Sequence, residues 1–175
     1  MGSEMCIRDR FPTTGEYCYD SPDPTRWEKL SRDLDIVVKP WNFNNGKNIL
    51  ICCQRDGGWS MDGEGVVNWL MKTISELRKY TDRPVVIRFH PGDKRVAGHI
   101  KQIAGYRIPK VSWSMADTIQ EDFANSYAVI NFNSSPAVAS VIEGLPTFQL
   151  DAGRSQAKGV VHTSLACLLY TSDAA

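Results

Sequence analysis

Two short polar stretches of the chain contain residue types that could bind a phosphate group. His90 is followed by Pro91, and Asn133, Ser134 and Ser135 follow one another directly. An imidazole titrates near neutral pH, and both an imidazole and a hydroxyl can donate hydrogen bonds to phosphate oxygens. Because Pro91 lacks an N–H and fixes its own φ, the chain must leave a sheet there and hold the imidazole at the rim. These residues predict an anion-binding site.

Each stretch also has a purely structural interpretation. Ser134 and Ser135 could simply cap a helix that begins immediately after them. His90 could bond a nearby backbone carbonyl. His99 and His162 have no comparable context, and we interpret both as surface or structural residues. The residue types alone leave the functional and the structural interpretations open.

A third polar stretch follows a predicted strand. Gln54, Arg55 and Gly57 could offer backbone amides and a guanidinium to an anion. The glycine spacing matches neither a GxGxxG nor a Walker A loop. Asp62 and Glu64 flank a glycine farther on, and we interpret them first as solvated charges at a helix start rather than as an acid–base pair.

The Ser134 stretch belongs to a strand–helix–strand unit. Residues 127–132 form an apolar run that is too short for a globular helix, which indicates a buried strand. A helix should begin at Pro136 and end near Gly144, and residues 147–150 should form the next strand. The apolar face of this helix would comprise Ala137, Val138, Val141 and Ile142.

The same alternation extends over the rest of the chain and predicts an α/β fold, namely a doubly wound, mainly parallel Rossmann-like sheet of about five strands with helices on both faces. Ligands of such sheets bind beyond the carboxyl ends of the strands. The further predicted strands are 49–53, 85–89 and 110–113. The further predicted helices are 24–34, 66–80, 96–104 and one opened by a Ser114/Asp117 capping box. The loops that follow the strand ends are 54–58, 90–93, 133–135 and 151–155.

Arg88 lies inside a predicted strand and would need a partner if its side chain pointed inward.

The composition excludes two classes of protein. Twenty basic and twenty acidic side chains give a net charge of zero, without the basic stripe of a nucleic-acid binder, and no apolar run is long enough for a membrane span. Cys52 and Cys53 would point to opposite faces of a strand, which argues against a disulfide framework or a zinc site. We expect no metal, a reducing compartment and a cytoplasmic location, in solution or peripheral to the inner face of the membrane.

Both ends of the chain resemble translated sequencing adapter. Residues 1–10, MGSEMCIRDR, and 167–175, CLLYTSDAA, correspond to the two orientations of a transposase end, and we set them aside as one would a fusion scar. We expect residues 11–47 to be a lead-in, helix and hinge from a missing upstream domain. Residues 48–166 would then form one truncated domain.

The segments RFHP at 88–91 and NSSPAVASVIEGLP at 133–146 resemble the donor-binding half of glycosyltransferases with two facing Rossmann-like domains, the GT-B type. The nearest likeness is to capsule polysaccharide enzymes: bacterial sialyltransferases, polysialyltransferases and Kdo transferases carry an HP motif and a downstream Ser-Ser or Ser-Thr motif. The resemblance covers residues 48–151, the ordinary span of one such domain.

This resemblance implies roles for individual residues. His90 would contact the donor phosphate and assist departure of the nucleotide, and Ser134 and Ser135 would hold the same phosphate. Glu143 would meet a ribose hydroxyl, or simply end a helix. The substrate would be a nucleotide-sugar, with CMP favoured over UDP, and no cofactor is implied. The predicted donor site comprises His90, Pro91, Gln54, Arg55, Gly57, Asn133, Ser134, Ser135 and Glu143.

The resemblance is incomplete at the general base. The sialyltransferases carry the base in a D/E-D/E-G motif of their other domain, which residues 61–63, MDG, echo only faintly. The glycan acceptor would also bind the upstream domain, so we expect this chain alone to turn over little. Two alternatives stay open: a nucleotide-sugar 2-epimerase of similar fold, with catalytic carboxylates in an interdomain cleft, and a non-catalytic ligand-binding or assembly module.

Overall fold

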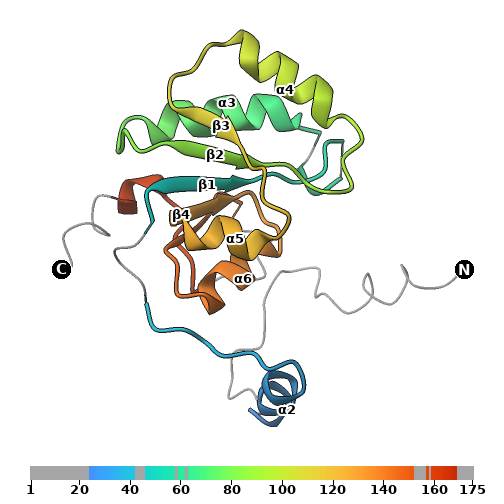
Figure 1. Cartoon of the computed structure of the whole chain (residues 1–175), viewed down its shortest axis with the longest axis vertical. Helices are drawn as coiled ribbons and strands as arrows, with labels where there is room; N and C mark the ends of the chain where they lie inside the picture. The colour runs from blue at the N-terminus through green and yellow to red at the C-terminus, as the bar shows by residue number, and fades with distance from the viewer. Residues whose placement is uncertain are drawn as a thin grey trace, which may run out of the picture. The chain divides into compact units, whose positions relative to one another are not determined.

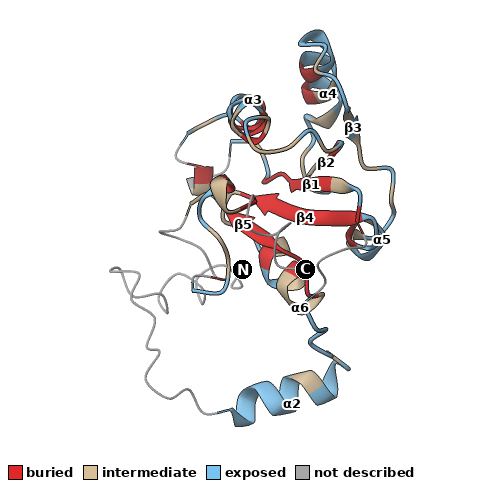
Figure 2. Cartoon of the chain, turned by 90° about the vertical axis from the view of Figure 1, so that its left-hand side faces the viewer, coloured by how far each residue is buried: buried red, intermediate tan, exposed pale blue. Residues whose placement is uncertain are grey.

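The computed structural model of the chain describes residues 24–41, 46–57, 59–61, 63–151, 157 and 159–168. The chain divides into two units, Met1–Val37 and Val38–Ala175. The first unit contains helix α2 (Thr25–Asp33), close to the predicted bounds. Its apolar face is exposed: Trp27 and Leu30 keep 45% and 42% of their surface, and no residue of the helix is buried (Figure 2). The apolar spacing therefore predicts this helix correctly.

The second unit contains a five-stranded sheet whose neighbouring strands are all parallel, in the order β3-β2-β1-β4-β5 (Figure 1). This confirms the predicted α/β fold class. The strands are β1 (Asn48–Cys52), β2 (Val85–Arg88), β3 (Val111–Trp113), β4 (Ser126–Asn131) and β5 (Thr147–Gln149); the helices are α3 (Val66–Leu77), α4 (Val96–Gly105), α5 (Ile119–Ala124) and α6 (Pro136–Ile142); two short 3-10 turns are η1 (Trp59–Met61) and η2 (Leu165–Cys167).

Helices cover both faces of the sheet. Alternate side chains of a strand point to opposite faces. Ile49 and Ile51 of β1 accordingly pack in one core cluster with α3 and α4, whereas Leu50 and Cys52 pack in a second cluster with α5 and α6. Every residue of β4 is buried, as expected of a central strand covered on both faces (Figure 2).

The start of α5 corrects one sequence prediction. The capping residue is Thr118 rather than Ser114: Thr118 Oγ1 accepts a hydrogen bond from the Glu121 backbone N–H and donates one to the Glu121 carboxylate. The N-cap thus lies four residues later than predicted, and the Glu121 carboxylate bonds the Thr118 hydroxyl rather than the backbone N–H that a capping box uses. Ser114 instead donates to Asp122, since the chain must first cross from the edge strand β3 to the opposite face.

Helix α6 begins at the predicted proline, and its predicted apolar face is buried only in part. Ala137 and Ser140 are buried, whereas Val138, predicted to face the core, is 38% exposed. Gly144 ends the helix as predicted, with a φ of +75°. A Cβ there would lie 2.2 Å from the Pro40 carbonyl oxygen, so both the backbone conformation and the close approach require glycine.

The segment after β5 returns to the core. Leu165 and Leu168 are buried in the same cluster as Phe148 of β5. The expected domain end at residue 166 therefore falls inside η2. None of the described helices is long and apolar enough to cross a membrane.

Candidate functional site

The strand order places the candidate site at the carboxyl edge of the sheet between β1 and β4. From β1 the chain continues to β2 and β3 on one side, whereas β4 and β5 lie on the other side. The strand order therefore reverses between β1 and β4, and the carboxyl ends of the strands at such a reversal are the usual position of a ligand in this fold. The loop after β1 contains Gln54, Arg55 and Gly57, and the loop after β4 contains Asn133, Ser134 and Ser135.

Two of the predicted residues join these loops directly. The Asn133 backbone N–H donates to Gln54 Oε1 at 3.4 Å, and Gln54 Nε2 donates to Ser60 Oγ at 2.9 Å. Asn133 Nδ2 donates to the Ser60 carbonyl and, at 2.8 Å, to Asp151 Oδ2. Gln54 is only 9% exposed. The side chains of Gln54 and Asn133 thus join the loop after β1 to the loop after β4.

The two serines occupy different environments. Neither side chain caps α6, although Ser135 holds the capping position. Ser135 is exposed, whereas Ser134 Oγ is enclosed and has no hydrogen-bond partner. Only Ser135 therefore presents its hydroxyl at the rim.

His90 lies in a tight turn at the end of β2. The Asp93 backbone N–H donates to the His90 carbonyl at 2.9 Å, and Pro91 occupies the second position of this turn. The Gly92 backbone N–H donates to His90 Nδ1 at 2.9 Å, so the neutral ring carries its proton on Nε2. The imidazole is exposed and its partner is a local backbone amide, not the carbonyl that the structural interpretation named. The Nε2–H group remains available as a donor at the rim.

The structure brings most, but not all, of the predicted residues to one edge. Strand β1 separates β2 from β4, so the ends that carry His90 and Ser135 are about 10 Å apart, two strand spacings. Arg55 is exposed beside them, and Gly57 has a φ of +71°. Glu143 lies at the far end of α6, toward the opposite edge, and pairs with Lys39.

A buried charge network beneath the rim was not predicted from the sequence. His99 of α4 is 8% exposed, and its Nε2 lies 3.3 Å from Asp93 Oδ2 and 3.8 Å from Asp56 Oδ2. Asp56 Oδ1 accepts from the Val66 backbone N–H at the start of α3, and Arg95 pairs with Asp56 at 2.9 Å. The network thereby connects the loops after β1 and β2 to the helices that follow each of them.

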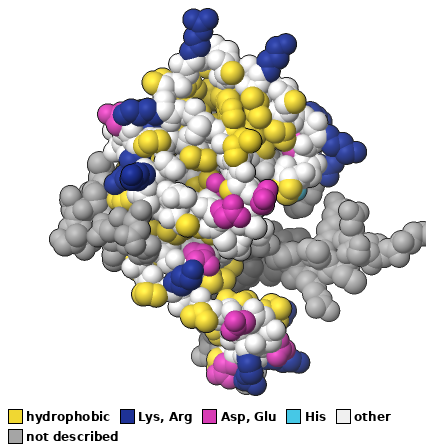
Figure 3. Space-filling view, in the orientation of Figure 1, with side chains coloured by type: hydrophobic (Ala, Val, Ile, Leu, Met, Phe, Trp, Pro, Cys, Tyr) yellow, Lys and Arg dark blue, Asp and Glu magenta, His cyan; other side chains and the backbone are white. Residues whose placement is uncertain are grey.

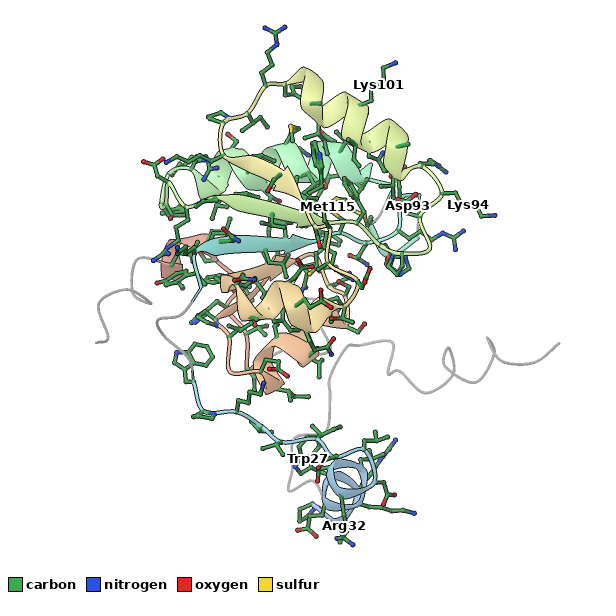
Figure 4. All side chains as sticks on the ribbon, viewed as in Figure 1. Trp27, Arg32, Asp93, Lys94, Lys101 and Met115 are labelled. Atoms are coloured by element: carbon green, nitrogen blue, oxygen red, sulfur yellow. The ribbon has the colours of Figure 1, made fainter. Side chains whose placement is uncertain are left out.

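Asp93 is the centre of this network. Its Oδ1 accepts from the Arg95 backbone N–H and its Oδ2 from the Asp56 backbone N–H. Burial opposes ionisation of the carboxyl, but these two amides and His99 outweigh it and lower the pKa of Asp93. Asp93 follows the HP motif after a single glycine, while Lys94 beside it points into solvent (Figure 4). That position, an aspartate in a strand-end turn, is the signal that could have identified the network.

Arg88 has the inward partner that the sequence required. Its Nη1 lies 2.7 Å from Asp122 Oδ2, and the side chains are 20% and 9% exposed. Arg88 also donates to the backbone carbonyls of Ala116 and Thr118. This pair fixes the crossing to α5, and both Nη groups of the guanidinium donate to that segment, so we assign it a structural role.

The described surface offers shallow hollows rather than a deep pocket. One of about 440 Å³ lies between α5 and α6, and Ser135 is its one polar lining residue. Another, of about 250 Å³, is lined by Lys39, Trp41 and Glu143 among others. On the face drawn in Figure 3, the described Lys and Arg side chains are scattered around the periphery. Among the described residues, no three Asp, Glu, His or Cys side chains are grouped to hold a metal ion.

The chain was compared with known proteins. No family model matches it, and no curated protein matches it significantly. The residues and the geometry described above therefore carry the functional argument.

Proposed function

We propose that this chain carries the nucleotide-sugar-binding half of a glycosyltransferase of the GT-B type, acting in surface or capsule polysaccharide synthesis. The observation that supports this most is positional. The HP motif follows β2 and the Ser-Ser motif follows β4, and these strands flank β1 on either side. Motifs separated by more than forty residues thus face the position where this fold binds nucleotides.

The residues at the rim suit the charge that forms during glycosyl transfer. Breaking the bond between sugar and phosphate develops negative charge on the leaving phosphate, and hydrogen-bond donors placed there lower the barrier. His90 Nε2–H and the Ser135 hydroxyl are the exposed donors at the two loop ends, and Arg55 adds a nearby positive charge. In our proposal His90 donates to the departing phosphate while Ser135 and Arg55 hold it.

The network under the rim supports this division of roles. Because the Gly92 N–H donates to His90 Nδ1, the ring orientation is fixed and Nε2–H is the group that can donate a hydrogen bond to the phosphate. Asp93 anchors the turn that holds His90, because its carboxylate accepts from the Asp56 backbone N–H and pairs with His99. Preorganised donors of this kind need little rearrangement when charge develops. The general base and the acceptor site are expected on a partner domain.

Nucleotide titration tests the proposal. The full chain would be titrated with CMP, UDP and GDP by thermal shift and calorimetry, alongside His90→Ala, Ser135→Ala and, as a matched control on the exposed surface of α3, Ser75→Ala. Ligand at a hundredfold excess over Kd stabilises by about 2.7 kcal/mol, an increase of roughly 5–10 °C in Tm. We expect one nucleotide to produce this increase, the two site variants to reduce it and the control to retain it.

Other outcomes separate the alternatives. Nucleotide binding that survives His90→Ala and Ser135→Ala unchanged would move the assignment to a non-catalytic module. The absence of any nucleotide effect on a folded chain would reject the donor-domain proposal.

A further inference from the structure

Two fully buried amides lie side by side beneath the Ser-Ser stretch. Asn131 of β4 and Gln149 of β5 are register partners and are both 0% exposed. Gln149 Nε2 donates to Asn131 Oδ1 at 2.8 Å and to the Ser134 carbonyl at 3.1 Å. Asn131 lies two residues after Val129, which packs in the cluster of α5 and α6, so both amides share that face of the sheet.

The chemistry of these contacts fixes the orientation of each amide. The Ser134 carbonyl can only accept, so the nitrogen of Gln149 must face it. The oxygen of Asn131 must then face that nitrogen. Three polar atoms are left enclosed and without partners: the donor Asn131 Nδ2, the acceptor Gln149 Oε1 and the hydroxyl Ser134 Oγ.

These three atoms define what they can bind. Buried polar groups are seldom left unpaired, and an internal water commonly satisfies them. A phosphate dianion has no proton for Gln149 Oε1, and a cation would be repelled by the amide hydrogens of Asn131. An uncharged hydroxyl complements all three, because its oxygen accepts two hydrogen bonds and its hydrogen donates one.

We propose that Asn131, Ser134 and Gln149 form an internal binding site for one uncharged hydroxyl oxygen. In the free protein the oxygen belongs to a water molecule, and an alcohol group of a bound ligand could replace it. The site itself does not depend on the proposed glycosyltransferase function. For the proposed glycosyltransferase function, the site implies that Ser134 bonds a neutral hydroxyl and that Ser135 and His90 bind the donor phosphate.

The site can be tested directly on the unmodified chain. A high-resolution crystal structure should show an oxygen within about 2.7–3.2 Å of Asn131 Nδ2, Ser134 Oγ and Gln149 Oε1. In solution, the side-chain amide protons of Asn131 should show cross-relaxation with a long-lived water. A dry interior, in which the amides have rotated to satisfy one another, would overturn the proposal.

Nucleotide-bound protein distinguishes the two sources of the hydroxyl. A water retained in the presence of CMP or UDP identifies an internal water, whereas a ribose oxygen in its place identifies a ligand subsite; either supports the hydroxyl site. A phosphate oxygen on Ser134 Oγ would refute it. If no nucleotide binds, the proposed function fails while the result on the free protein still decides this site.

Paired serine variants add a functional measurement. Ser134→Ala should weaken the affinity for the bound nucleotide less than Ser135→Ala does, because it removes at most a contact to a neutral hydroxyl and none to the phosphate. Ser135→Ala should weaken that affinity by about tenfold or more, as expected for loss of a hydrogen bond to a charged group. The reverse order of effects would contradict the assignment of the two hydroxyls.

Discussion

Breaking the ion pair between Arg88 and Asp122 should strongly destabilise the sheet unit. Arg88 Nη1 lies 2.7 Å from Asp122 Oδ2, and the two side chains are only 20% and 9% exposed. Ser114 Oγ donates to the same carboxylate at 2.7 Å. Because β2 supplies the arginine and α5 the aspartate, the pair attaches this helix to the sheet.

The magnitude follows from the burial of the two groups. Removing one partner of a buried pair costs about 3–5 kcal/mol, since the remaining charge is left uncompensated. Water still reaches a fifth of Arg88, and the carbonyls of Ala116 and Thr118 still accept from it. We therefore expect Asp122→Leu to reduce the free energy of unfolding by about 2–3 kcal/mol. For a domain of this size, Tm should fall by roughly 4–12 °C.

A double-mutant cycle measures the pair. Urea unfolding followed by circular dichroism would compare Asp122→Leu, Arg88→Met and the double variant, which should recover much of the loss because two apolar side chains leave no buried charge. Glu76→Gln, which breaks the exposed pair with Lys79, is the control and should have no measurable effect. The reasoning is refuted if Asp122→Leu is as mild as the control, or if the double variant loses the sum of both single effects.

Three further predictions concern glycine, pH and thiols. Gly144→Ala should lower the free energy of unfolding, measured with urea, by at least about 1–2 kcal/mol, because the backbone φ there is +75°. Gly98→Ala, which adds a methyl group in open space on α4, should raise the free energy of unfolding by about 0.5–1 kcal/mol. Equal effects of the two variants would contradict backbone strain at Gly144. Since folding lowers the pKa of Asp93, its carboxylate stabilises the fold above the ordinary aspartate pKa of about 3.9, and this contribution is lost as the pH falls through the lowered value. Asp93→Asn should therefore flatten the loss of stability at acid pH, and an unchanged pH profile would disprove the shift. Burial raises the pKa of Cys52 to about 12 and that of Cys53 well above its ordinary value, so mass spectrometry should find both unalkylated by iodoacetamide at pH 8 until the chain unfolds.

The elements of the fold could be predicted because their signals act over a few residues. The apolar run at 127–132 is too short for a helix and therefore indicates a strand. Pro136 begins α6 because its missing N–H would be unpaired in the first turn, and Gly144 ends it because only glycine adopts that φ without strain. Alternation of such elements then favours a parallel sheet covered on both faces.

The predictions that failed depended on contacts between distant segments. Thr118 rather than Ser114 caps α5, because Ser114 is engaged by a carboxylate on that helix. For His99 the structural interpretation is the correct one, but its partners, two aspartates from strand-end loops, were not predicted. The exposed face of α2 shows that apolar spacing indicates a helix face without indicating what covers it. No local pattern encodes these outcomes.

The candidate site shows the same division. The sequence by itself determined that His90, Gln54 and the Ser134 stretch follow strands, because turn residues and proline end each apolar run. Only the tertiary structure decided that β1 lies between β2 and β4, which brings these loops to one edge, and that the side chains of Asn131 and Gln149 meet. The physical reason is that strands pair through backbone groups common to all residues, so the partner of a strand is selected by the packing of the whole sheet.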